Sequence, residues 1–165
     1  MKKTIRLLSL ALLVILTLMG TAFANDRATH TISVTIPEKV EIILSRTNID
    51  FGFVIDGPEV LEDSLDVTYR CNKSGGDWQL TISGTDFASA TSPDTFSVDY
   101  LKWKKANDGM YQDMPKTTPG EVGAVVATGN TPGYNTTKIY YQMTMPTDVH
   151  AGQYTNTVTY SLIVP

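Results

Sequence analysis

Apolar and polar residues alternate along most of the chain after its first 24 residues, and no segment there holds a helical period for long. Alternation at a period of two puts successive side chains on opposite faces of a strand, so it predicts strands with one buried face. The clearest run covers residues 154–164, and others cover 30–36, 40–44, 65–71, 78–82 and 139–145. Weaker strands are predicted at 48–53, 95–104 and 121–128.

Turn-forming residues interrupt the chain wherever the alternation stops. They are Asp56-Gly57-Pro58, 73–77, Asn107-Asp108-Gly109, Thr118-Pro119-Gly120, 129–133 and His150-Ala151-Gly152. Seven or more short strands with regular turns are typical of an all-β fold, and we predict an immunoglobulin-like antiparallel β-sandwich. A closed barrel is the alternative. Because no repeat or linker divides the chain, residues 25–165 are predicted to form a single domain.

Residues 1–24 have the three parts of a secretory signal peptide. Lys2, Lys3 and Arg6 give a positive start, an apolar run follows from Leu7 to Met19, and Ala22-Phe23-Ala24 is a small-x-small cleavage site. The apolar run is shorter than the roughly 20 residues of a spanning helix. We therefore expect a secreted protein that begins at Asn25, lies at the cell surface or in the periplasm, and has no membrane anchor after cleavage.

The net charge of the chain limits the classes of partner that it can bind. The segment from residue 25 onward carries ten basic residues against 17 acidic ones, a net charge of −7 with histidine neutral. Nucleic-acid binding needs a basic surface, so we expect no nucleic-acid partner. Binding to anionic lipid is disfavoured for the same reason.

Cys71 is the only cysteine, so no disulfide can form within the chain. An unpaired cysteine in a secreted protein can pair between chains, or it can be a buried apolar thiol. Alternation places Cys71 on the same strand face as Leu65, Val67 and Tyr69, which favours burial.

The sequence offers little for catalysis. Only two histidines follow the signal segment, His30 in a predicted strand and His150 in a turn, and no nucleophile, zinc or phosphate-binding motif accompanies them. An acidic group surrounds one loop, but its spacing fits no calcium-binding pattern. Its members are Asp56, Glu59, Glu62, Asp63 and Asp66. We expect no enzyme, with a secreted hydrolase as the least favoured alternative, and no catalytic, cofactor or metal site.

Several aromatic residues fall in loops or on the polar face of a strand, among them Tyr111, Tyr134 and Tyr140. Exposed aromatic rings can stack on sugars or anchor a protein partner. Ordinary packing between neighbouring strands is the equal alternative.

Two stretches resemble the WxL cell-surface domains. The segment 76–82, with Trp78 and Leu80, is similar to the first W-x-L motif, and 152–162, with Tyr160 and Leu162, is similar to the C-terminal motif, although Tyr160 stands where that family has Trp. The resemblance implies non-covalent attachment to a cell wall, with peptidoglycan or another envelope protein as the partner. Because large residues at a period of two belong first to a core, we expect Trp78 to pack inside, with wall binding as the alternative role of these four residues.

The same stretches also resemble the spore coat protein U family and the related pilins. There a Phe-Gly element, here Phe51-Gly52, precedes a strand that ends in Cys, here 67–71, and a late strand like 152–158 closes the domain. The cysteine that family usually has near its N-terminus is missing from 40–45. This resemblance implies a fimbrial or coat-type subunit and makes self-assembly a candidate.

The alternating segment 28–36 is the natural element for such assembly. It directly follows the predicted cleavage site, and Pro37 separates it from the next strand. Ile32, Val34 and Ile36 would fill a neighbouring subunit by strand exchange. Alternatively, the segment pairs with residues 154–164 of its own chain. We expect pairing within the chain, because nothing in 25–36 resembles a long flexible arm.

Overall fold

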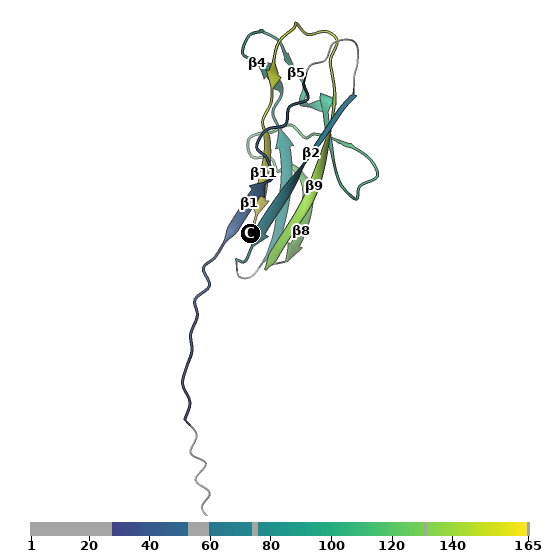
Figure 1. The fold of residues 1–165 in the computed structure, drawn as a ribbon. Coiled ribbons are helices and arrows are strands. Elements are labelled where there is room, and N and C mark those ends of the chain that lie inside the picture. The colour runs from purple at the N-terminus through teal and green to yellow at the C-terminus, as the bar shows by residue number, and fades with distance from the viewer. Residues whose placement is uncertain (1–27, 53–59, 74–75, 131, 165) are drawn as a thin grey trace, which may run out of the picture. The chain divides into compact units, whose positions relative to one another are not determined.

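The computed structural model describes residues 28–52, 60–73, 76–130 and 132–164, and the regular secondary structure in these ranges is almost entirely β-strand (Figure 1). The strands are β1 (Val40–Leu44), β2 (Val60–Cys71), β3 (Asp77–Gly84), β4 (Phe87–Ser89), β5 (Thr95–Phe96), β6 (Leu101–Lys105), β7 (Gln112–Asp113), β8 (Ala124–Asn130), β9 (Gly133–Thr144), β10 (Tyr154–Thr155) and β11 (Val158–Ile163). One 3-10 turn, Val98–Tyr100, precedes β6. The described ranges contain no α-helix.

Three sheets are formed. The largest has the strand order β1-β2-β9-β6-β7, the second β11-β3-β8, and a small third sheet β10-β4-β5. Every ladder between these strands is antiparallel. The predicted all-β class and the antiparallel β-sandwich are therefore confirmed.

The core lies between the inward faces of the two larger sheets. Val67 of β2, Ile139 of β9 and Trp103 of β6 are fully buried, and Leu80 and Ile82 of β3 are fully buried opposite them. Burying one such side chain stabilises the fold by roughly 1.5–3 kcal/mol. Cys71 is a free, buried thiol beside this core. It shares its strand face with Leu65, Val67 and Tyr69, as the alternation predicted.

β2 and β9 form the longest ladder, and each is 12 residues long. Their register runs from Val60 opposite Thr144 to Cys71 opposite Gly133. At about 3.3 Å per residue, this ladder extends for roughly 36 Å. Both strands are longer than predicted, because their first halves carry Thr, Ser and Asp residues that conceal the alternation.

Four predicted strands differ from the structure. The one predicted at 95–104 is divided into β5 and β6 by the 3-10 turn at Val98–Tyr100. Residues 30–36 and 48–52 form no strand, although alternation predicted one in each; Phe53 lies outside the described residues. A strand exists only when a neighbour accepts its main-chain hydrogen bonds, and neither segment pairs with another in the described ranges. The continuous run predicted at 154–164 is divided into β10 and β11, because residues 154–155 join β4 and residues 158–163 join β3.

Residues 36–165 form one compact unit that contains the whole sandwich. The domain boundary at residue 25 stays a prediction. Within the described ranges, no helix is long and apolar enough to cross a membrane.

Candidate functional site

The last strand of the sandwich has one open edge. β11 pairs with β3 on one side, and its other side pairs with no described strand. Its inward-facing residues are only partly buried, whereas the equivalent residues of β9 in the middle of the large sheet are 0–3% exposed. The partly buried row is Tyr154, Asn156, Val158, Tyr160, Leu162 and Val164. This row, apolar except for Asn156, lies beside an open edge and is incompletely covered by the described residues.

The first strand has an open edge as well. β1 pairs with β2 alone, and Ile42 and Leu44 on its inner face are partly buried. β1 and β11 lie next to each other in Figure 1 but form no ladder. Open edges normally carry charges, prolines or bulges that prevent pairing with another chain. Across β11, the residues are Val158-Thr159-Tyr160-Ser161-Leu162-Ile163, with none of these features.

The segment before β1 is extended and highly exposed. Residues 28–39 form no ladder with any described strand. Ile32 and Val34 are each 84% exposed, and Ile36 is 75% exposed. Exposing a row of β-branched apolar side chains is costly in water, so such a row normally finds a partner. No ladder joins this segment to the C-terminal strand within the described ranges, and the expected pairing within the chain stays a prediction.

The four motif residues lie in the sandwich interior to different extents. Trp78 is 5% exposed and Leu80 is fully buried, while Tyr160 and Leu162 belong to the partly buried row of β11. Leu80 and Leu162 are direct cross-strand neighbours. The structure therefore brings the two motifs together on adjacent strands.

Trp78 occupies a slot that two glycines make possible. A Cβ added at Gly129 or Gly133 would lie 2.5 Å or 2.9 Å from the indole ring. The Trp78 Nε1 group donates a hydrogen bond to the main-chain oxygen of Asn130 at 3.1 Å, and Tyr69 packs against the ring. These contacts enclose the ring and place Trp78 in the core.

Tyr160 reaches across the sandwich to the opposite sheet. Its hydroxyl group lies 2.6 Å from that of Tyr141 on β9. Burial raises the pKa of Tyr141 to about 12, and the hydrogen bond with Tyr160 partly opposes that rise. Burial also raises the pKa of Tyr160, and the nearby Tyr141 adds to it. Two neutral hydroxyl groups that share a hydrogen bond are the state this interior favours.

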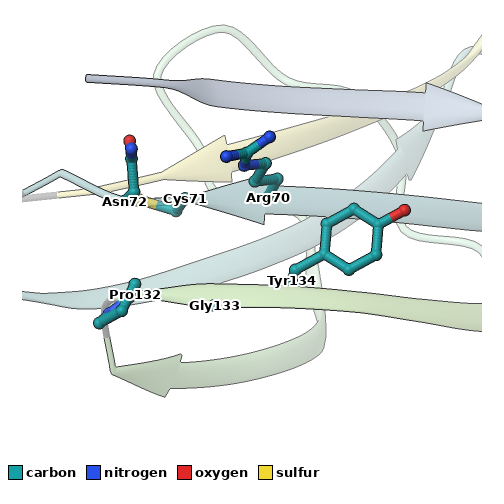
Figure 2. Close-up of a pocket in the computed structure, with 6 residues that line it drawn as sticks. All are labelled: Arg70, Cys71, Asn72, Pro132, Gly133 and Tyr134. Atoms are coloured by element: carbon teal, nitrogen blue, oxygen red, sulfur yellow. The ribbon is translucent and has the colours of Figure 1, made fainter. Parts of the chain in front are cut away.

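A surface hollow of about 430 Å³ lies where β2 ends and β9 begins (Figure 2). It is lined by Arg70, Cys71, Asn72, Pro132, Gly133 and Tyr134. Arg70 and Tyr134 are cross-strand partners, and Tyr134 is 70% exposed. Of the aromatic residues singled out from the sequence, Tyr134 is thus exposed, whereas Tyr111 and Tyr140 pack around the ammonium group of Lys104.

Asn72 holds the segment that leads into β1. Its side-chain oxygen accepts a hydrogen bond from the main-chain N–H of Lys39, and its Nδ2 group donates to the main-chain oxygen of Pro37 at 3.0 Å. Its own N–H donates to the main-chain oxygen of Lys39 at 3.1 Å. Sequence inspection missed Asn72, because a single Asn after a strand carries no signal of a partner 35 residues earlier.

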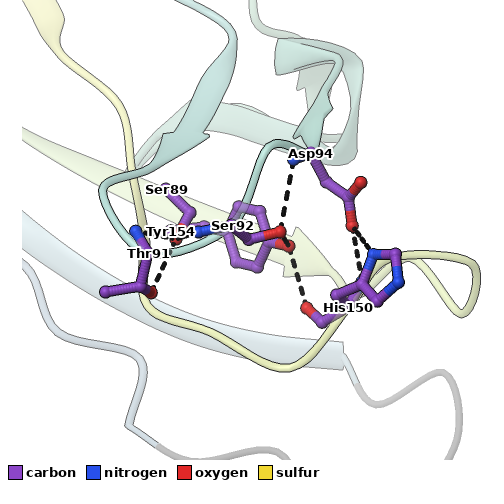
Figure 3. A network of polar contacts seen from close by, with 6 residues as sticks. All are labelled: Ser89, Thr91, Ser92, Asp94, His150 and Tyr154. Carbon is purple, nitrogen blue, oxygen red and sulfur yellow. Dashed lines mark hydrogen bonds and ion pairs between the residues drawn. The ribbon is translucent and has the colours of Figure 1, made fainter.

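At the opposite end of the sandwich, a polar network joins the turn between β4 and β5 to the segment before β10 (Figure 3). Asp94 Oδ2 accepts from the main-chain N–H of His150 at 2.7 Å and lies 2.5 Å from its Nδ1. The Tyr154 hydroxyl group donates to the main-chain oxygen of His150 at 2.8 Å, and its oxygen lies 3.3 Å from Ser92 Oγ. The two hydrogen bonds from His150 lower the pKa of Asp94, the main-chain one most.

This network does not form a nucleophile–histidine–acid arrangement, because Ser92 contacts Tyr154 and not the imidazole ring of His150. His30 lies in the exposed segment before β1. Among the described residues, no three His, Cys, Asp or Glu side chains are placed to hold a metal ion. Asp56 and Glu59 of the acidic group lie outside the described residues.

Comparison with known proteins gives one family match. Residues 26–161 match the model of the Spore Coat Protein U domain. A search of curated proteins found no match. Among solved structures, the chain is similar to the P pilus rod subunit PapA, with 13% sequence identity over 79% of this chain and 100% of that one, at a TM-score of 0.44. Of the two resemblances seen in the sequence, the family match supports the spore coat one and gives no support to WxL.

Proposed function

The chain belongs to the Spore Coat Protein U domain family, and from this we propose that it is an exported structural subunit that assembles with copies of itself by strand exchange. In this proposal the segment 28–36 of one copy adds to the open edge of β11 in the next copy. The assembly lies at the cell surface or in the periplasm. A domain named for a coat protein agrees with the expectation of a structural role and not a catalytic one.

One observation carries the proposal: the same chain contains an incompletely covered apolar row and an exposed strand-like segment that is not paired with it. Ile32, Val34 and Ile36 alternate at the spacing of the half-buried residues of β11. Main-chain hydrogen bonds along the open edge would supply affinity, and alternate apolar side chains would supply specificity. Both exposed surfaces become buried when the segment of one copy meets the edge of another.

The length of the segment supports the match. Residues 28–36 are as many as residues 156–164, which hold five of the six members of the half-buried row. At about 3.3 Å per residue, each extends for roughly 30 Å. The segment therefore needs no additional linker to cover the row from end to end.

The experiment compares polymer formation by the chain from Asn25 onward with that of two variants, using sedimentation velocity. Ile32→Asp combined with Val34→Asp puts charges on the apolar face of the segment, and we expect it to stay monomeric. Ser33→Asp combined with Thr35→Asp adds the same charge on the other face and should still polymerise. A monomeric unmodified chain at every concentration, or equal loss in both variants, would refute strand exchange.

A further inference from the structure

The segment that is proposed to exchange has no linker residues between its last apolar residue and the point where it joins the sandwich. Ile36, its last apolar residue, is followed directly by Pro37, whose main-chain oxygen is bonded to Asn72. Neighbouring Cα atoms are about 3.8 Å apart. When Ile36 sits against a second copy, the Asn72 side chain and the hollow that it lines (Figure 2) must lie at the surface of that copy.

The direction of the added segment decides which part of the second copy meets the hollow. All strand ladders of the sandwich are antiparallel, so antiparallel addition to β11 continues the pattern of the fold. Parallel addition would bring two hollow-bearing ends together and close a pair of copies. Antiparallel addition leaves the donating copy with a free edge and the accepting copy with a free segment, so further copies can add at both ends of an extended polymer.

β11 runs toward the hollow-bearing end of the sandwich. Ile163 at its end is opposite Gln79, next to Trp78, whereas Tyr154 on the preceding β10 is opposite Ser89 of β4 at the far end. An added segment that runs antiparallel to β11 therefore ends, at Ile36, beside β10 and β4 of the second copy. The surface that the hollow meets is the far end of the second copy, which holds the network of Asp94 and His150 (Figure 3).

The far end is acidic. Residues 85–101 and 145–157 contain four aspartates and no lysine or arginine. Lys116 pairs with Asp86, and Asp94 is engaged by His150. Asp99 and Asp148 are exposed and make no ion pair with a described residue. Asp99 lies two residues before Leu101, and Leu101 is the cross-strand partner of Met143 near the end of β9. Asp148 lies in the loop that follows β9.

The hollow offers a cation that forms no ion pair within the described part of the chain. Arg70 is exposed and makes no ion pair with any residue in the described ranges. Glu41 faces it across the β1–β2 ladder, but Glu41 is paired with Lys39 at 2.7 Å. Beside Arg70, the exposed ring of Tyr134 adds a broad contact surface of the kind that anchors protein interfaces.

We infer that Arg70 and Tyr134 form an end-to-end docking surface for the acidic far end of a second copy of this chain, with Arg70 facing Asp99 and Asp148. This inference rests on the proposed strand exchange and adds to it a second contact that fixes how consecutive copies are oriented. Strand exchange supplies the affinity, and the charged contact supplies the alignment and the rate of joining.

The experiment measures polymer formation by light scattering at low salt in full-length chains from Asn25 onward. Arg70→Glu should raise the concentration needed for half-maximal polymer by roughly tenfold, because like charges then meet. Lys138→Glu makes the same charge change on the outer face of β9, where Lys138 pairs with Asp66, and should assemble as the unmodified chain does. Arg70→Glu combined with Asp99→Lys and Asp148→Lys should recover assembly.

A synthetic peptide of residues 28–36 separates this inference from the proposed function. Excess peptide should shorten polymers of the unmodified chain and bind Arg70→Glu equally well, because the β11 edge is unchanged. Peptide binding together with normal assembly of Arg70→Glu, or a failed recovery in the triple variant, would overturn the end-to-end contact alone. If the peptide has no effect on any chain, strand exchange fails, and the inference fails with it.

Discussion

At the scale of single residues, Trp78 shows how a motif that suggested wall binding serves the core. Trp78→Ala should destabilise the chain by roughly 3–5 kcal/mol in urea unfolding, as large-to-small core changes do. Tyr134→Ala, at a ring that is 70% exposed, should change stability by no more than about 0.5 kcal/mol. A Trp78→Ala chain that unfolds like the unmodified one but fails to bind isolated cell walls would make Trp78 a contact residue after all.

The glycines around Trp78 make a second test of the same slot. Gly129→Ala places a methyl group 2.5 Å from the indole ring, closer than carbon atoms approach. Because the β-strand and the indole ring must then shift, we expect the free energy of unfolding in urea to fall by roughly 1–3 kcal/mol. Gly109→Ala is the matched control, since an added Cβ there meets nothing within 4 Å. Equal stability of the two variants would show that the slot is not tightly packed.

The Tyr141–Tyr160 pair makes stability depend on alkaline pH. The pKa of Tyr141 is raised from 10.0 to about 12 in the folded chain, so the unfolded chain loses its proton first. The stability that this residue contributes is complete below pH 10 and is lost as the pH rises toward 12, with a slope of about 1.4 kcal/mol per pH unit. Urea unfolding at pH 9, 10 and 11 should show that the free energy of unfolding falls less steeply with pH in Tyr141→Phe than in the unmodified chain. An unchanged slope would contradict the burial of this hydroxyl group.

At the scale of elements, Asp94 and His150 connect the β4–β5 turn to the short strand β10. The lowered pKa of Asp94 means that its contribution is present above its ordinary value of 3.8 and disappears as the pH falls through the folded-state value. We expect amide hydrogen exchange in β4 and β10 to become faster below that pH, and Asp94→Asn to show the faster exchange at neutral pH. The β2–β9 ladder is the internal control. Equal acceleration there would mean global unfolding and not release of this contact.

At the scale of the whole molecule, we expect the sandwich to be stable without the exposed segment. Removing residues 25–36 should change the melting temperature by no more than about 2 °C, because Ile32 and Val34 are 84% exposed and bury almost nothing in their own chain. The shortened chain should form no polymer. A large drop in melting temperature would show that this segment pairs within its own chain, which is the expectation from sequence.

The sequence by itself determined the class of fold, because a period of two is a local property that each strand carries alone. The alternation of 65–71 and 78–82 predicted β2 and β3, and it placed Cys71 on the buried face correctly. Turn residues marked where those strands end. The resemblance to the spore coat protein U family also came from short local motifs, and the family match over residues 26–161 agrees with it.

Only the tertiary structure decided which strands have partners. The segments 30–36 and 154–164 both alternate, yet the first forms no ladder in the described ranges and the second is divided between β4 and β3. Alternation reports that a face can be buried, while pairing depends on which edge lies within hydrogen-bonding distance. Contacts between residues distant in the chain produce three features that no local pattern contains. They are the open edge of β11, the hydrogen bond between Asn72 and Pro37, and the location of Arg70 at the end opposite the acidic one.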